Sequence, residues 1–171
     1  GLVYFENRKG LEAVGRNLYR ATQAAGEPVL ALDSAQTSII MQNYLEASNV
    51  KTVEEMVKLI GGKGNIVEIY NDAGSMIRTR RNAMHEVIKD YPDIKIIAGF
   101  VYAWPDFFPD AKAKMEAVIQ ANPNPGDIAA VYATFDGVGV AAAQAIREAG
   151  LQDHIVVVGI DGDPEAYAEM R

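Results

Sequence analysis

The chain has 171 residues, of which 49% are hydrophobic, and this is enough for a packed core and too much for a disordered chain. Its 23 acidic and 16 basic side chains give a formal net charge of −7, and no basic run is present. This balance argues against a nucleic-acid-binding surface and against attachment to an anionic membrane, since both depend on clustered Lys and Arg. The absence of cysteine excludes disulfides, thiolate metal sites and a cysteine nucleophile.

The first third of the chain is interpreted as strands and helices joined by a crossing segment. A β-branched or apolar run predicts a strand, and apolar residues three and four apart predict a helix. Gly26 and the pair Gly61-Gly62 are plausible helix stops. We predict, in order, a strand at 2–5, a helix at 9–25, a strand at 28–33, a crossing segment at 34–43 and a helix at 48–60.

The remainder of the chain alternates between the two kinds of element. Strands are predicted at 65–70, 94–100, 128–134 and 155–161, helices at 76–91, 111–121 and 137–148, and an aromatic loop at 101–109. Alternation of this kind predicts an α/β fold, with a parallel sheet, helices on both of its faces and right-handed crossovers.

The stretch IVVVGIDGDPE at 155–165 combines a buried strand with a turn at its carboxyl end. In open α/β sheets this end is where ligands bind. Asp161 is therefore a candidate ligand-binding carboxylate. The alternative is that Asp161 only shapes the turn or caps a helix that starts near Pro164.

Acidic, amide and aromatic residues recur after the predicted strands, and the carboxyl ends of these strands meet at one edge of the sheet. They are Asp33, Asn71, Asp72, Tyr102, Trp104, Asp106, Phe135, Asp136, Asp161 and Asp163. A sugar needs this mixture, because its C–H faces pack on rings and its hydroxyls need polar partners. Turns and helix N-termini also favour acids, and this alternative accounts for part of the set.

Arg81 is predicted on the apolar side of its helix, four residues after Ile77 and three before Met84. Its planar guanidinium could hold two ligand oxygens. The alternative is an internal ion pair with one of the edge carboxylates. Arg78 and Arg80 are predicted on solvated faces.

Other motifs compete with a sugar site. The G-x-G-x-x-A sequence at 137–142 follows a strand and predicts, as an alternative, an NAD(P)-binding domain of an oxidoreductase. Phe135 and Asp136 separate the strand from the first glycine, which weighs against that interpretation. His85 and His154 are isolated, so no metal site is predicted. We find no catalytic nucleophile or base and expect no cofactor and no enzyme activity.

Several segments together resemble the type I periplasmic sugar-binding proteins of ABC transporters, similar to the ribose- and galactose-binding proteins. The resemblance rests on EPVLALDS, GGKGNIVEIYNDAG, an arginine-rich helix start, MEAVIQANP, IAAVYATFDGVGVAAAQAIREAG and IVVVGIDGDPEA, in this order between 27 and 166. It implies a Rossmann-like fold of two lobes, with residues 1–43 as the last part of the first lobe and the hinge crossing, and 44–171 as the second, ligand-binding lobe. We expect the chain to be a fragment, with one near-complete lobe.

The same resemblance implies the ligand-binding residues. Asp33 matches the acid before the hinge, Arg81 the arginine after the Ala73-Gly74 turn, and Asp161 the acid of the GIDG signature. Phe135 stands where ribose-binding members carry asparagine. Trp104 or Phe107 would supply the stacking ring.

The resemblance implies a solute-binding component that carries a monosaccharide or similar polyol to a membrane permease, with a periplasmic or extracytoplasmic location and no nucleic-acid partner. Lac-repressor-like transcription regulators share the ligand fold and are a second alternative. We expect this chain to bind sugar weakly or undetectably, with micromolar or tighter affinity contradicting that expectation.

Overall fold

The computed structural model describes residues 11–15, 18–21, 47–72 and 74–169. The chain forms two compact units, Gly1–Tyr44 and Leu45–Arg171. The predicted elements at 2–5, 28–33 and 34–43, and with them Asp33, lie outside the described residues. The assignment of the first 43 residues to a first lobe stays a prediction.

A β-hairpin occupies the described part of the first unit. Strand β1 (Leu11–Gly15) pairs antiparallel with β2 (Leu18–Ala21), and Leu11 lies opposite Ala21. The predicted helix at 9–25 is therefore wrong. The apolar spacing that predicts the helix extends across Gly15 and Asn17, two residue types that are unfavourable inside helices.

The second unit begins with α1 (Ala47–Leu59) and then alternates strictly between strands and helices. Its further elements are β3 (Gly64–Tyr70), α2 (Ser75–Ile88), β4 (Ile94–Val101), α3 (Phe107–Ala121), β5 (Ala130–Ala133), α4 (Asp136–Glu148), β6 (Val156–Val158) and α5 (Pro164–Glu169). The four strands form one parallel sheet in the order β4-β3-β5-β6. The predicted α/β class with a parallel sheet is confirmed.

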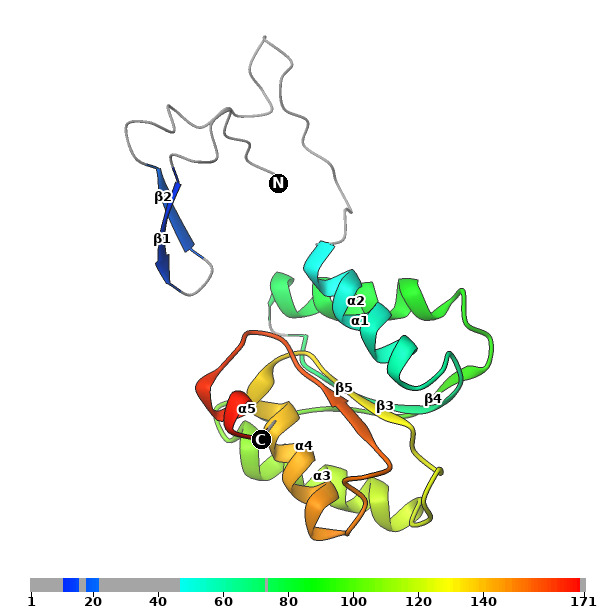
Figure 1. The fold of residues 1–171 in the computed structure, drawn as a ribbon. Helices are drawn as coiled ribbons and strands as arrows, with labels where there is room; N and C mark the ends of the chain where they lie inside the picture. Colours follow the sequence, from blue (N-terminus) through cyan, green and yellow to red (C-terminus); the bar gives the residue numbers. More distant parts are fainter. Residues whose placement is uncertain (1–10, 16–17, 22–46, 73, 170–171) are drawn as a thin grey trace. The chain divides into compact units, whose positions relative to one another are not determined.

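Helices cover both faces of this sheet, with α1 and α2 on one side and α3 and α4 on the other (Figure 1). Residues of β3 alternate between the two faces, so that Ile66 packs under α1 and α2 while Val67 and Ile69 pack under α3 and α4. All four residues of β5 are buried. Burial on both faces explains the continuous apolar sequence of β5.

The carboxyl ends of the strands form one rim of the second unit. Tyr70 at the end of β3 pairs with Val101 of β4, and Tyr132 of β5 pairs with Val158 of β6. Helix α3 starts at Phe107, four residues earlier than predicted, and so takes up part of the predicted aromatic loop. Residues that follow all four strands are thus brought to the same rim.

Among the described helices, none combines the length and the apolar character that crossing a membrane requires.

Candidate functional site at the carboxyl rim

A buried arginine organises one part of the rim. Arg80 on α2 is only 6% exposed. Its Nη1 donates to the backbone oxygen of Thr134 at 2.8 Å and to Oδ2 of Asp161 at 3.1 Å, while Nη2 pairs with Oδ1 of Asp161. The hydroxyl of Tyr132 donates to the backbone oxygen of Arg80 at 2.9 Å. The ends of β5 and β6 are therefore tied to α2 through one side chain.

The prediction that Arg80 lies on a solvated face is wrong. The position is three residues after Ile77 and four before Met84, so it is on the inward side as much as Arg81 is. Helical spacing therefore could not choose between the two neighbours. The choice depends on which one finds partners for its buried charge, and Arg80 finds Thr134 and Asp161.

Arg81 forms an ion pair away from Asp161. Its Nε donates to Oε1 of Glu68 at 2.7 Å, and its guanidinium lies 3.5 Å from the centre of the Tyr70 ring. The hydrogen bond that Arg81 donates to Glu68, a β3 acid with a buried side chain, raises the pKa of Arg81. Nε2 of His85 lies 3.0 Å from the same oxygen. Arg81 thus forms an internal ion pair, but its main partner is Glu68 within β3, whereas the edge carboxylate of Asp72 lies 3.9 Å from Nη1. A ligand role for Arg81 stays a prediction.

Asp161 reaches Arg80 from a turn with unusual backbone geometry. Its φ is 132°, and Gly162 follows with φ 76°. The Asp136 carboxylate accepts hydrogen bonds from the backbone N–H groups of Gly162 at 2.6 Å and Asp163 at 2.8 Å. A third of the Asp161 side chain is exposed. We call Arg80, Thr134, Asp136 and Asp161 the charged cluster.

Four rings form a second group, the aromatic cluster, which consists of Tyr102, Trp104, Phe107 and Phe135. Trp104 is 70% exposed and stacks on Phe107, with ring centres 5.5 Å apart and planes 15° apart. The Phe135 ring meets Phe107 and Tyr102 edge to face, at 5.0 and 5.2 Å. The cluster therefore extends from the buried Tyr102 to the solvent-exposed ring of Trp104.

Asp110 on α3 holds the loop that carries Trp104. Its Oδ2 accepts from the backbone N–H of Ala103 at 2.8 Å and from Nζ of Lys114 at 2.8 Å. The bond from Lys114 lowers the pKa of Asp110, and the bond from Ala103 acts in the same direction. The backbone next to the exposed ring is therefore held by the Asp110 side chain, whose ionised form is favoured by Lys114.

The two clusters meet at Tyr102. Burial raises the pKa of the Tyr102 hydroxyl, while the neighbouring Thr134 hydroxyl and the charge of Arg80 oppose that shift. Because Thr134 also contributes its backbone oxygen to Arg80, the charged cluster continues into the aromatic one. The rim presents hydrogen-bond donors, a carboxylate and a ring surface side by side.

The glycines of the G-x-G-x-x-A sequence serve packing in this structure. A Cβ on Gly137 would lie 2.6 Å from the Phe135 ring and 2.7 Å from the Phe107 ring, and one on Gly139 would lie 3.3 Å from Cβ of Ala133. The start of α4 is therefore covered by aromatic side chains, where a dinucleotide-binding helix would need room for a diphosphate. In the described residues, no group of three or more His, Cys, Asp or Glu could hold a metal ion.

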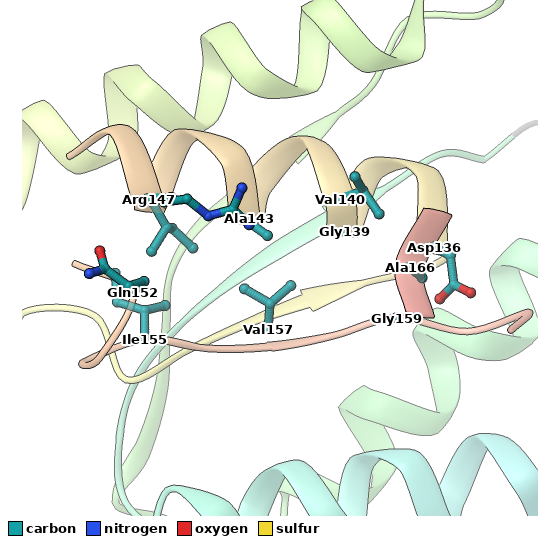
Figure 2. Close-up of a pocket in the computed structure, with 11 residues that line it drawn as sticks. Asp136, Gly139, Val140, Ala143, Arg147, Gln152, Ile155, Val157, Gly159 and Ala166 are labelled. Carbon is teal, nitrogen blue, oxygen red and sulfur yellow. The ribbon is translucent and has the colours of Figure 1, made fainter. Parts of the chain in front are cut away.

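A cavity of about 280 Å³ lies beside the rim, between α4, β6 and α5 (Figure 2). Asp136 and Gly159 line one end of it, and Arg147 and Gln152 lie at the other. None of the five predicted site residues lines this cavity, which shares only Asp136 with the charged cluster. The cavity is therefore separate from the site at the rim.

The structure brings three of the five predicted site residues to the rim: Trp104, Phe135 and Asp161. Arg81 is held to one side by Glu68, and Asp33 lies outside the described residues. Sequence reasoning missed Arg80. It also missed Glu68, although an acid inside an apolar strand is a signal that a basic partner lies nearby.

A family described as the periplasmic binding protein domain matches residues 10–171. The chain belongs to this family. Among the relatives of this periplasmic binding protein domain is a D-apiose import binding protein of Actinobacillus succinogenes, which is 32% identical over 148 residues. The match covers 82% of this chain and 45% of that protein, so the chain spans less than half the length of this relative.

A solved structure of an ABC transporter solute-binding protein from Agrobacterium vitis with bound allitol is also similar. It superposes with a TM-score of 0.66 and 31% sequence identity, over 69% of this chain and 41% of that one. This likeness agrees with the parallel sheet of the second unit.

A shorter sequence match is to a protein of a different kind. The flagellar basal-body rod protein FlgG of Buchnera aphidicola is 43% identical to the chain over 60 residues, which is 34% of the chain and 23% of the rod protein. This match is too short to assign a second family.

Proposed function

We propose that this periplasmic binding protein domain is the ligand-binding part of a solute-binding protein of an ABC transporter, and that it holds a monosaccharide or similar polyol at the rim without chemical change. The observation that carries the proposal is the pairing of Arg80 with Asp161 next to an exposed aromatic stack. A polyol needs donors and acceptors fixed in space, together with a ring for its C–H face.

Each cluster has a distinct role in this proposal. Asp161 accepts from a sugar hydroxyl with the exposed part of its carboxylate, and the Arg80 guanidinium fixes that carboxylate and donates to a neighbouring oxygen. Nε of Arg80 is buried and has no partner among the described residues. Trp104 and Phe135 provide the ring surface. We place the arginine role at Arg80 and keep Asp33 and Arg81 as predicted contributors.

The wider setting is part of the same proposal. The names of the relatives speak of import and ABC transport, and they support a location outside the cytoplasmic membrane and delivery of the ligand to a permease. We propose neither an enzyme activity nor a nucleic-acid partner. A sensor domain of a regulator and a dinucleotide-binding domain are the competing functions.

An NMR titration of the 15N-labelled 171-residue chain tests the proposal. Hexoses, pentoses and their polyols at millimolar concentration should shift the signals of Arg80, the Trp104 indole, Phe135 and Asp161, with affinity weaker than micromolar. Trp104→Ala should abolish the response, while Leu59→Ala, at an exposed apolar residue of α1, should preserve it. Shifts confined to 137–142 on adding NAD, with none from any sugar, would favour the dinucleotide-binding alternative and reject the proposal.

A further inference from the structure

The turn after β6 holds Asp161 in a backbone conformation that side chains rarely adopt. Its φ of 132° is accessible to glycine and strained for a residue with a Cβ. Such conformations persist where the surrounding structure enforces them. The turn therefore requires a restraint, and the geometry points to Asp136.

Asp136 binds the backbone on both sides of Asp161. Its Oδ2 accepts from the N–H groups of Gly162 and Asp163, at 2.6 and 2.8 Å, and its own N–H donates to the backbone oxygen of Ile160 at 2.9 Å. The residue is only 6% exposed, so these bonds are shielded from water. Hydrogen bonds to an ionised carboxylate are among the stronger ones in proteins.

The chain is also shaped to receive this carboxylate. A Cβ on Gly159 would lie 2.4 Å from Oδ1 of Asp136 and 3.3 Å from its Cα. Figure 2 shows the two residues next to each other at one end of the cavity. Gly159 thus allows β6 to pass the first residue of α4 closely, and the carboxylate fits into the turn that follows.

We propose that Asp136 is the positioning residue that holds Asp161 in the conformation in which its carboxylate meets Arg80 and faces the rim. The ligand-facing part of this inference rests on the proposed function, and the ordering of the turn does not. A purely structural role, in which the acid only stabilises the start of α4 through the helix dipole, is the competing explanation.

The first test needs no ligand. In Asp136→Ala, the amides of Gly162 and Asp163 should exchange with solvent roughly tenfold faster or more, because a bond to a charged acceptor is lost. The NMR signals of Asp161 should move towards those of an unrestrained residue. Asp136→Asn should give a smaller change and serves if the alanine variant does not fold. Gly159→Ala should disturb the same amides through steric overlap with Asp136.

Asp127→Ala is the matched control. Asp127 also accepts a backbone N–H in a turn, from Asn124 at 2.8 Å, but it precedes β5, at the opposite end of the sheet. It should leave Gly162, Asp163 and Asp161 unchanged. Unchanged exchange at Gly162 and Asp163 in Asp136→Ala would overturn the proposal.

The second test uses a polyol that shifts the rim signals of the unmodified chain. At a fixed polyol concentration, Asp136→Ala and Asp161→Ala should each reduce the Trp104 indole shift at least fivefold, and the double variant should lose no more than Asp161→Ala alone. A normal polyol response in a folded Asp136→Ala variant would leave Asp136 with the purely structural role. If no polyol shifts the rim of the unmodified chain, the proposed function fails, while the exchange rates and the Asp161 signals still decide whether Asp136 positions Asp161.

Discussion

The charged cluster and the aromatic cluster share one rim but are built differently. Arg80 and Asp136 are buried and bonded to backbone atoms at the ends of β5 and β6. Trp104, by contrast, is 70% exposed, and its ring stacks on the ring of Phe107. The charged cluster therefore supports the fold itself, whereas the outer part of the aromatic cluster can be altered with little effect on folding.

This difference follows from the chemistry of the two groups. A buried charge without partners is costly, so the partners must be fixed before any ligand arrives. An aromatic ring at the surface loses little by being exposed and can keep its face free for a sugar. The comparison predicts large stability effects at Arg80, intermediate effects at Phe135 and small ones at Trp104.

Arg80→Met should have the largest effect on stability. The variant leaves the buried Thr134 oxygen without its charged donor and breaks a partly buried ion pair with Asp161, and the two losses together typically cost about 3 kcal/mol of unfolding free energy. Urea denaturation measures the loss. Arg78→Met on the same helix is the control, and its cost should stay within about 0.5 kcal/mol because Arg78 is exposed. Equal costs for the two variants would remove the distinction between the clusters.

Phe135→Asn should destabilise the protein less, by about 2 kcal/mol, because a half-buried ring is replaced by a smaller polar amide. The lost contacts are the edge-to-face pairs with Phe107 and Tyr102. Phe135→Leu keeps the apolar volume and should cost about 1 kcal/mol. If Phe135→Asn and Phe135→Leu lower the unfolding free energy equally, the ring is not packed in the way that the structure describes.

The amount that the sequence could predict also differs between regions. The four parallel strands and their helices follow from buried apolar runs and helical spacing, which is why the predicted elements from 48 onwards match the structure closely. The helix predicted at 9–25 follows from apolar residues three and four apart, whereas the hairpin at Leu11–Gly15 and Leu18–Ala21 depends on cross-strand pairing that this spacing does not encode.

The site shows the same division. Trp104, Phe135 and Asp161 are predicted at the rim because they follow strands, and topology alone carries such residues there. The choice between Arg80 and Arg81 could not be made from spacing, because each lies three or four residues from the same apolar neighbours. It is decided by long-range partners, with Thr134 and Asp161 for one arginine and Glu68 for the other.

Trp104→Ala should change the unfolding free energy by about 0.5 kcal/mol or less, since the ring is mostly exposed and loses mainly its stack on Phe107. The same variant should lose the polyol response, which separates binding from stability. Thermal denaturation combined with the NMR titration checks both parts. A large loss of stability would show that the aromatic cluster supports the fold as the charged cluster does.

A further small effect depends on pH. Asp110 has a lowered pKa because it binds Lys114 and the N–H of Ala103, so its contribution to stability is complete above the ordinary value of 3.8 and is lost as the pH falls through the lower folded-state value. The unfolding free energies of the unmodified protein and Asp110→Asn should differ by about 0.5 kcal/mol at pH 6, as expected for an ion pair near the surface. They should converge as the pH is lowered further below 3.8.

Glu148→Gln provides the matched control for the acid effect. Glu148 also has a pKa lowered by a lysine, Lys112, but lies at the last residue of α4, away from the rim. For both variants, the difference in unfolding free energy from the unmodified protein should become smaller in acid. Only Asp110→Asn should shift the Trp104 indole signal at pH 6, because Ala103 precedes Trp104 and depends on the Asp110 carboxylate. An indole signal that moves equally in both variants would show that Asp110 acts through general electrostatics and does not hold the loop of the aromatic cluster.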